Sequence, residues 1–101
     1  MLLPGCGASK RFDARAWRAQ DDDHPVRDAM VDDLIHSRRL DGMTRGEVVA
    51  LLGPPTPTDK WRNWSLVYWL GPDRTYTPID SSWLVIRLTD GRVTAYERVE
   101  D

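Results

Sequence analysis

The sequence predicts an α+β domain in which two helices pack on one face of a three-stranded antiparallel sheet. Two stretches with helical spacing of apolar residues come first, at 24–39 and 45–52. Three stretches rich in branched and aromatic residues follow, at 65–70, 82–89 and 92–99. The last two flank Asp90-Gly91, a dipeptide typical of a tight hairpin turn.

Length and composition fit one folded domain. The chain has 101 residues, of which 41% are hydrophobic and 30% charged, so wholesale disorder is not expected. Its net charge is −2, without the basic excess typical of a nucleic-acid-binding protein. No apolar run is long enough for a transmembrane helix. Five tryptophans are more than a core of this size needs, which suggests that some serve a surface.

The start of the chain resembles the end of a bacterial lipoprotein signal peptide. Leu3 stands three residues before the single cysteine, Cys6, and the small residue Gly5 stands directly before it. Such a cysteine is lipidated, and each buried CH₂ of the lipid contributes about 0.8 kcal/mol to membrane binding. We therefore expect Cys6 to be a lipidation site. The alternative is an ordinary chain end with an incidental cysteine, since a full signal peptide has about 7–15 apolar residues.

Residues 1–23 are expected to form an N-terminal tether or arm, ahead of a single domain at 24–101. Phe12 and Trp17 fit either a short helix or an extended arm that docks its two aromatic side chains. The acidic triplet at 21–23 precedes His24-Pro25, and proline suits the first position of a helix. An apolar stripe then predicts a helix that ends in the basic residues before Leu40.

The second helix has explicit start and stop signals. Thr44 and Glu47 form a capping box, and Gly53 suits the left-handed conformation after a helix end. Pro54 and Pro55 prevent continuation, so the helix spans about Arg45 to Leu52. A helix this short is unstable in isolation, and it must therefore pack on the sheet.

A two-residue turn at Asp90-Gly91 sets the expected register, with Ile86 opposite Ala95. One face of the hairpin then faces the helices: Leu84, Ile86, Leu88, Val93 and Ala95. The other face mixes aromatic and basic residues and is expected to be exposed: Trp83, Val85, Arg87, Thr94, Tyr96 and Arg98.

These motifs, in this order, resemble the SmpA/OmlA (BamE-like) family of small bacterial outer-membrane lipoproteins. The resemblance covers residues 40–99 and rests on GMTxxEV, LGxP, an aromatic strand and WLVIRLTDGRVTAYE. It implies an ααβββ fold, a location on the periplasmic face of the outer membrane and a role in assembling or maintaining the envelope. Some relatives with this fold, the β-lactamase-inhibitor-like proteins, bind partner proteins through the exposed sheet face.

We therefore expect a non-enzymatic envelope lipoprotein that binds an envelope protein partner and is held to the membrane by a lipid on Cys6. Tryptophan, tyrosine and arginine are enriched at binding hot spots. The predicted partner-binding residues are Trp83, Arg87, Tyr96 and Arg98. In the alternative to this prediction, Phe12 and Trp17 cover the same face and it has no partner.

The sequence leaves two other functions as alternatives. An inhibitor or peptide-binding module would use the exposed sheet face or edge, because residues 65–70 carry few charges that would blunt an edge strand. An enzyme is not expected, because His24 and His36 lie at opposite ends of one helix, about 18 Å apart. No cofactor, metal, nucleic acid or small-molecule substrate is expected.

Overall fold

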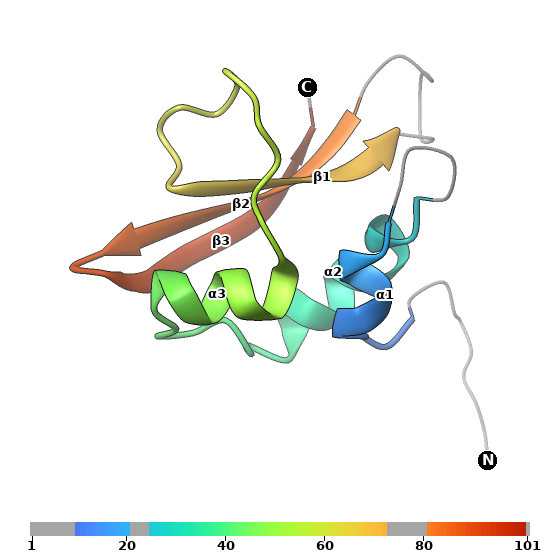
Figure 1. Ribbon diagram of the computed structural model, residues 1–101, viewed down its shortest axis with the longest axis horizontal. Coiled ribbons are helices and arrows are strands. Elements are labelled where there is room, and N and C mark those ends of the chain that lie inside the picture. The colour runs from blue at the N-terminus through green and yellow to red at the C-terminus, as the bar shows by residue number, and fades with distance from the viewer. Residues whose placement is uncertain (1–9, 21–24, 73–80, 101) are drawn as a thin grey trace.

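The computed structural model describes residues 10–20, 25–72 and 81–100. Three helices precede three strands: α1 Ala14–Arg18, α2 Arg27–His36, α3 Arg45–Leu52, β1 Leu66–Pro72, β2 Ser81–Thr89 and β3 Arg92–Glu100. The strands form one antiparallel sheet in the order β1-β2-β3, and the helices lie together on one side of it (Figure 1). The α+β class is confirmed, with one helix more than the two that were predicted.

The additional helix, α1, lies in the segment that was expected to be an arm. Asp13 caps it by accepting a hydrogen bond from the backbone N–H of Ala16. Trp17 is fully buried in the core, where its ring meets the Tyr68 ring edge-on. Phe12 ties the start of the segment to α2, donating its backbone N–H to an Asp33 carboxylate oxygen at 2.7 Å. The described part of the expected arm thus packs on the core as part of the domain.

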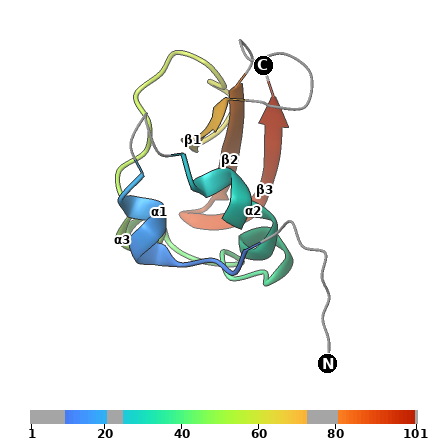
Figure 2. The ribbon, with the colours of Figure 1, turned by 90° about the vertical axis from the view of Figure 1, so that its right-hand side faces the viewer.

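Helix α2 begins two residues later than the position expected from Pro25. The side-chain oxygen of Gln20 accepts hydrogen bonds from the backbone N–H groups of Val26 and Arg27, at 2.6 and 2.7 Å. A side chain from the preceding segment therefore satisfies donors that the first helical turn leaves without partners. The acidic residues 21–23 and His24, expected near this helix start, lie outside the described residues. Figure 2 shows α2 in front of the sheet.

Helix α3 has the predicted bounds and both hydrogen bonds of the predicted capping box between Thr44 and Glu47. At its other end, Gly53 has a φ of 85°, which favours glycine. The carbonyl of Gly53 accepts a 2.8 Å hydrogen bond from the buried hydroxyl of Tyr68 on β1. Arg18 of α1 donates to the last carbonyls of α3, those of Ala50 and Leu51. The short helix is thus fixed from two sides.

The hairpin between β2 and β3 departs from the expected register. Leu88 faces Val93 as predicted, but a β-bulge follows, and Arg87 faces Ala95 while Ile86 faces Tyr96. Thr94 has no partner in the register, and its hydroxyl lies 2.9 Å from that of Thr89. One extra residue on a strand moves all later side chains to the opposite face. The predicted pairing of Ile86 with Ala95 is therefore wrong.

Two hydrophobic clusters lie on opposite faces of the sheet. The larger lies between helices and sheet and consists of Trp17, Met30, Val31, Leu34, Leu40, Val48, Leu52, Leu66, Tyr68, Leu70, Leu84, Ile86 and Val93. The smaller, here called the outer cluster, contains Val67, Trp83 and Val85, with Trp61, Trp64, Trp69 and Val99 packed around them. Among the described helices, none is long and apolar enough to span a membrane.

Candidate binding face

The segment that joins α3 to β1, residues 54–65, is here called the tryptophan loop. It leaves the helical layer and passes to the other side of the sheet (Figure 1). Thr56 attaches it to the edge strand β1: its N–H donates to the Val67 carbonyl, and its hydroxyl accepts from the Trp69 N–H, both at 2.9 Å. The loop therefore occupies part of the edge of β1.

The tryptophan loop covers the outer face that the sequence predicted to be exposed. Trp61 and Trp64 pack against the outer cluster, and Trp83, predicted to contact a partner, is only 7% exposed. Phe12 and Trp17, the predicted alternative cover, belong to the cluster on the helical side. The expectation of an open face is thus corrected, and the covering segment is one that had not been considered.

The β-bulge separates the four predicted partner-binding residues. Trp83 and Arg87 lie on the outer face, whereas Tyr96 and Arg98 pair with Ile86 and Leu84 and lie on the helical face. The prediction that all four residues share one face of the sheet is therefore wrong. Its cause is the extra residue in β3, which an alternating pattern does not reveal.

Tyr96 contacts the connection between α2 and α3. Its hydroxyl donates to a carboxylate oxygen of Asp41, which also pairs with Arg38 at 2.9 Å. Burial and the Asp41 carboxylate together raise the pKa of Tyr96 to about 12, and the hydrogen bond from Tyr96 lowers the pKa of Asp41. Tyr96 thus anchors a connection within the domain.

Arg98 joins β3 to helix α2. Its Nε lies 3.0 Å from an Asp28 carboxylate oxygen, and its terminal nitrogens donate to Glu100 and to the hydroxyl of Ser82, both at 2.9 Å. Burial alone would lower its pKa, but the hydrogen bonds and charges of Asp28 and Glu100 outweigh burial and raise it. The geometry assigns Arg98 to the scaffold.

Arg87 fixes the tryptophan loop to β2. Its guanidinium lies 4.2 Å from the centroid of the Trp64 ring, within the range of a cation–π contact. Its Nη2 also donates to the carbonyl of Asn63 at 3.4 Å. Of the four predicted residues, Arg87 alone is both on the outer face and exposed.

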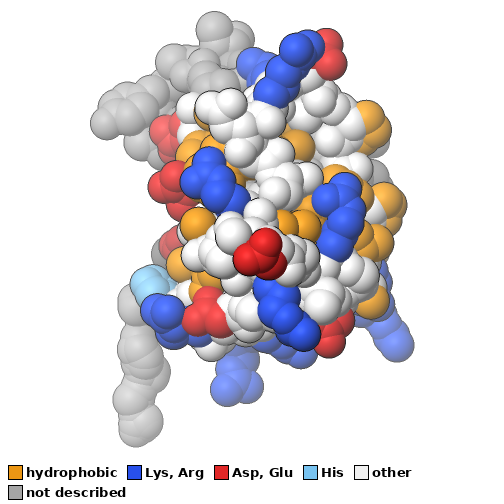
Figure 3. Space-filling model, turned by 90° about the vertical axis from the view of Figure 1, so that its left-hand side faces the viewer, with side chains coloured by type: hydrophobic (Ala, Val, Ile, Leu, Met, Phe, Trp, Pro, Cys, Tyr) orange, Lys and Arg blue, Asp and Glu red, His pale blue; other side chains and the backbone are white. Residues whose placement is uncertain are grey.

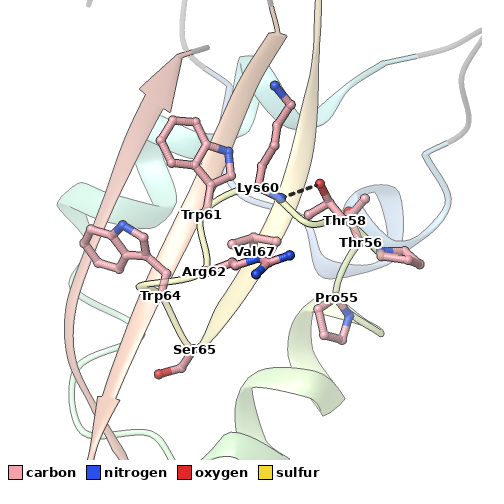
Figure 4. A pocket seen from close by; sticks show the side chains of 10 residues that line it. Pro55, Thr56, Thr58, Lys60, Trp61, Arg62, Trp64, Ser65 and Val67 are labelled. Carbon is pink, nitrogen blue, oxygen red and sulfur yellow. Dashed lines mark hydrogen bonds between the residues drawn. The ribbon is translucent and has the colours of Figure 1, made fainter.

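A groove of about 280 Å³, here called the loop groove, lies between the tryptophan loop and β1. It is lined by Pro55, Thr56, Pro57, Thr58, Lys60, Trp61, Arg62, Trp64, Ser65 and Val67 (Figure 4). Lys60 and Arg62 are basic, and the lining contains no carboxylate. Basic and acidic side chains and hydrophobic surface lie interspersed on the side of the molecule shown in Figure 3.

Trp61 combines a left-handed backbone with a buried indole nitrogen. Its φ of 61° is in the left-handed region, which bulky residues rarely adopt. Its indole Nε1 is buried without a hydrogen-bond partner among the described residues, as are those of Trp17 and Trp83. In Figure 4 this nitrogen is on the side of the ring that faces Lys60. Trp61 thus lines the groove, while its Nε1 is covered by other protein atoms.

Within the described ranges, no group of three or more His, Cys, Asp or Glu side chains is placed to hold a metal ion. His36 is exposed at the end of α2. Cys6, the predicted lipidation site, and His24 lie outside the described residues.

Sequence reasoning missed Trp61, Arg62 and Trp64 as candidate binding residues. The stretch WRNW places an arginine between two tryptophans, directly after the proline-rich PPTPT and before a strand. Together with the excess of tryptophan, this pattern was the available signal. The sequence matches no family model, and comparisons with curated proteins and with solved structures find no match.

Proposed function

We propose that this chain is a non-enzymatic binding module of the bacterial cell envelope, which binds a protein partner through the tryptophan loop. The observation that carries the proposal is the loop groove, in which Trp61, Trp64 and Arg62 line one concave surface. Tryptophan and arginine are the residue types that contribute most to binding energy at protein interfaces. The proposed working surface is therefore the loop over the outer face of the sheet.

The SmpA/OmlA resemblance supports the envelope part of the proposal. Its motif residues occupy defined positions: Thr44 and Glu47 form the capping box of α3, Gly53 ends that helix, and Asp90-Gly91 forms the hairpin turn. Membership of the family, a place on the periplasmic face of the outer membrane, a lipid on Cys6 and a role in envelope assembly or maintenance all belong to this proposal.

Binding of a peptide at a sheet edge is a weaker candidate than binding in the groove. On the edge of β1, the Val67 carbonyl and the Trp69 N–H are already hydrogen-bonded to Thr56. On β3, Val93 exchanges backbone hydrogen bonds with Gly42 and Met43. An incoming strand would have to displace these bonds, whereas the groove is already present.

A photo-crosslinking amino acid at position 62 tests the proposal in a bacterial host of the chain. We expect a discrete crosslinked protein from position 62 and none from position 15, an exposed site on α1. Equal crosslinking from both positions, or none from position 62, would contradict binding through the tryptophan loop.

A further inference from the structure

We propose that the groove between α1 and α2, here called the helix groove, binds a small amphiphile that carries a carboxylate on an apolar chain. The helix groove lies among the helices, whereas the tryptophan loop passes to the other side of the sheet (Figure 1). The inference therefore goes beyond the proposed function and can fail without it. It is carried by the apolar floor of the groove, by two cations in its lining and by an exposed valine at the start of α2.

The helix groove has the size of a small-molecule site and an apolar floor. Its volume is about 360 Å³, and ligand pockets in proteins span about 300–1,000 Å³. The lining consists of Lys10, Arg11, Asp13, Ala16, Pro25, Val26, Ala29 and Met30. Five of these residues are apolar, one from α1 and four from α2 and the two residues before it. Such a floor suits a hydrocarbon chain.

Lys10 and Arg11 give the lining positive charge. Their side chains are exposed, and neither forms an ion pair with another described residue. The one acid of the lining, Asp13, accepts a hydrogen bond from the Ala16 N–H at the start of α1. Residues 10–20 contain four basic residues and one acidic residue, although the whole chain has a net charge of −2. Electrostatic complementarity therefore favours an anionic ligand here.

Several backbone groups of the lining are already hydrogen-bonded. The N–H of Lys10 donates to the Ala29 carbonyl at 2.8 Å, and the N–H of Asp13 donates to the Met30 sulfur at 3.3 Å. The described chain thus begins beside α2 and leads into α1 (Figure 2). Because these donors are used, the two cationic side chains are the groups that would hold the charged head of a ligand.

Val26 is exposed at a position where a polar residue is usual. It is the N-cap of α2, a position that favours Ser, Thr, Asp and Asn because their side chains accept hydrogen bonds from the helix start. Gln20 supplies that acceptor instead. Among the described large hydrophobic residues Val26 is the most exposed, at 36%. Capping therefore does not explain this valine, whereas an apolar ligand chain in the groove would cover it.

Chemical-shift titrations by NMR on the full chain test the inference with four probes, all below the concentrations at which they form micelles. We expect octanoate to cause saturable shifts of the amide signals of Lys10, Ala29 and Met30. Octan-1-ol, which lacks the charge, should bind about ten-fold more weakly, and octylammonium should not bind. Butanoate has four fewer CH₂ groups and buries less apolar surface, so it should bind at least about ten-fold more weakly than octanoate.

Two variants test the lining. Val26→Thr keeps the shape of the side chain and suits an N-cap, so the melting temperature should not fall while octanoate affinity falls about three-fold. Arg11→Gln should weaken octanoate binding about five-fold and leave octan-1-ol binding unchanged. Arg45→Gln on α3 is the matched control for loss of one exposed arginine, and it should bind octanoate like the parent chain.

Equal affinity for octanoate and octan-1-ol would overturn the role of the cations, and unchanged octanoate affinity in Val26→Thr would overturn the role of the apolar floor. Shifts confined to residues 61–64 would place the ligand at the tryptophan loop and contradict the inference. The absence of saturable shifts with octanoate would do the same. Crosslinking from position 62 remains a separate test, so failure of the helix groove and failure of the proposed function are distinguishable.

Discussion

The guanidinium of Arg87 on β2 lies over the indole ring of Trp64, 4.2 Å from its centroid. Because Arg87 also donates to the carbonyl of Asn63, this contact holds the backbone of the tryptophan loop as well as a ring. Trp61 lies three residues earlier in the same loop and packs on the same cluster. The position of the groove wall thus depends on a residue of the sheet.

Replacing Arg87 by alanine should loosen the tryptophan loop. We expect a loss of about 0.5–1 kcal/mol in the free energy of unfolding, the size of an exposed cation–π contact. Amide hydrogen exchange at residues 61–64 should accelerate. Urea denaturation and exchange measured by NMR check these effects. Arg45→Ala on the exposed surface of α3 is the control. Similar exchange rates in both variants would argue that Arg87 does not hold the tryptophan loop.

Replacing Arg98 by methionine should lower stability without affecting partner capture. The variant loses hydrogen bonds to Asp28, Glu100 and Ser82, and we expect a cost of about 1–2 kcal/mol after allowing for solvent screening. Urea denaturation measures the cost, and crosslinking from position 62 measures capture. If the variant is still folded but no longer crosslinks a partner, Arg98 belongs to the binding surface and this prediction is wrong.

Replacing Trp17 by alanine should unfold the domain or nearly so. The side chain is fully buried among helices and sheet, and removal of a core tryptophan costs about 3–5 kcal/mol. Circular dichroism during thermal unfolding checks this result. Phe12→Ala, at a partly buried position, should cost less. A folded Trp17→Ala chain with parental stability would restore the view of residues 10–20 as a detachable arm.

Alkaline pH should destabilise the protein through Tyr68. Burial raises the pKa of this phenol from 10.0 to about 12. Because the folded-state pKa is above the unfolded value, the stabilisation is complete below pH 10 and is lost as the pH rises through about 12. Urea denaturation across this window should show a steep loss of stability.

The control for the alkaline prediction is Tyr68→Phe. It should be less stable at neutral pH by about 1 kcal/mol, because the hydrogen bond to the Gly53 carbonyl is lost. Its stability should, however, fall less between pH 10 and 12. Tyr96, whose pKa is also raised to about 12, contributes in the same window, so the double replacement should flatten the profile further. Parallel profiles in all variants would exclude both phenols as the cause.

Replacing Cys6 by serine should release the protein from the membrane fraction. A thioether-linked lipid requires the sulfur atom, and the Leu3 to Cys6 stretch has the spacing of a lipidation signal. Metabolic labelling with an alkyne-bearing fatty acid, followed by fractionation, provides the measurement. Expression from the gene's own start is needed here, so that any upstream leader is present. Label retained in Cys6→Ser would show that the lipid lies elsewhere.

Local signals in the sequence were sufficient for most of the secondary structure. The capping residues Thr44 and Glu47 define α3 because their hydrogen bonds close within four residues of chain. Asp90-Gly91 defines the hairpin equally locally, because a two-residue turn of this kind needs a positive φ at both positions. The φ angles are 52° at Asp90 and 82° at Gly91. Interactions of this range can be read without knowing the fold.

The binding face could not be predicted in the same way. One extra residue, Thr94, turned Tyr96 and Arg98 to the helical side, and an alternating pattern fits either register. Trp61 and Trp64 lie in a loop without a periodic pattern, so the strand on which they pack could not be identified from their spacing. Contacts between segments distant in sequence decided both points.

By itself, therefore, the sequence determined the α+β class, the two main helices, the three strands and their turn, because each follows from interactions within a few residues. Only the tertiary structure decided that Trp17 belongs to the core, that Arg98 pairs with Asp28 and that the tryptophan loop covers Trp83. Those outcomes depend on which buried surfaces fit together over the whole chain, and no local pattern encodes that fit.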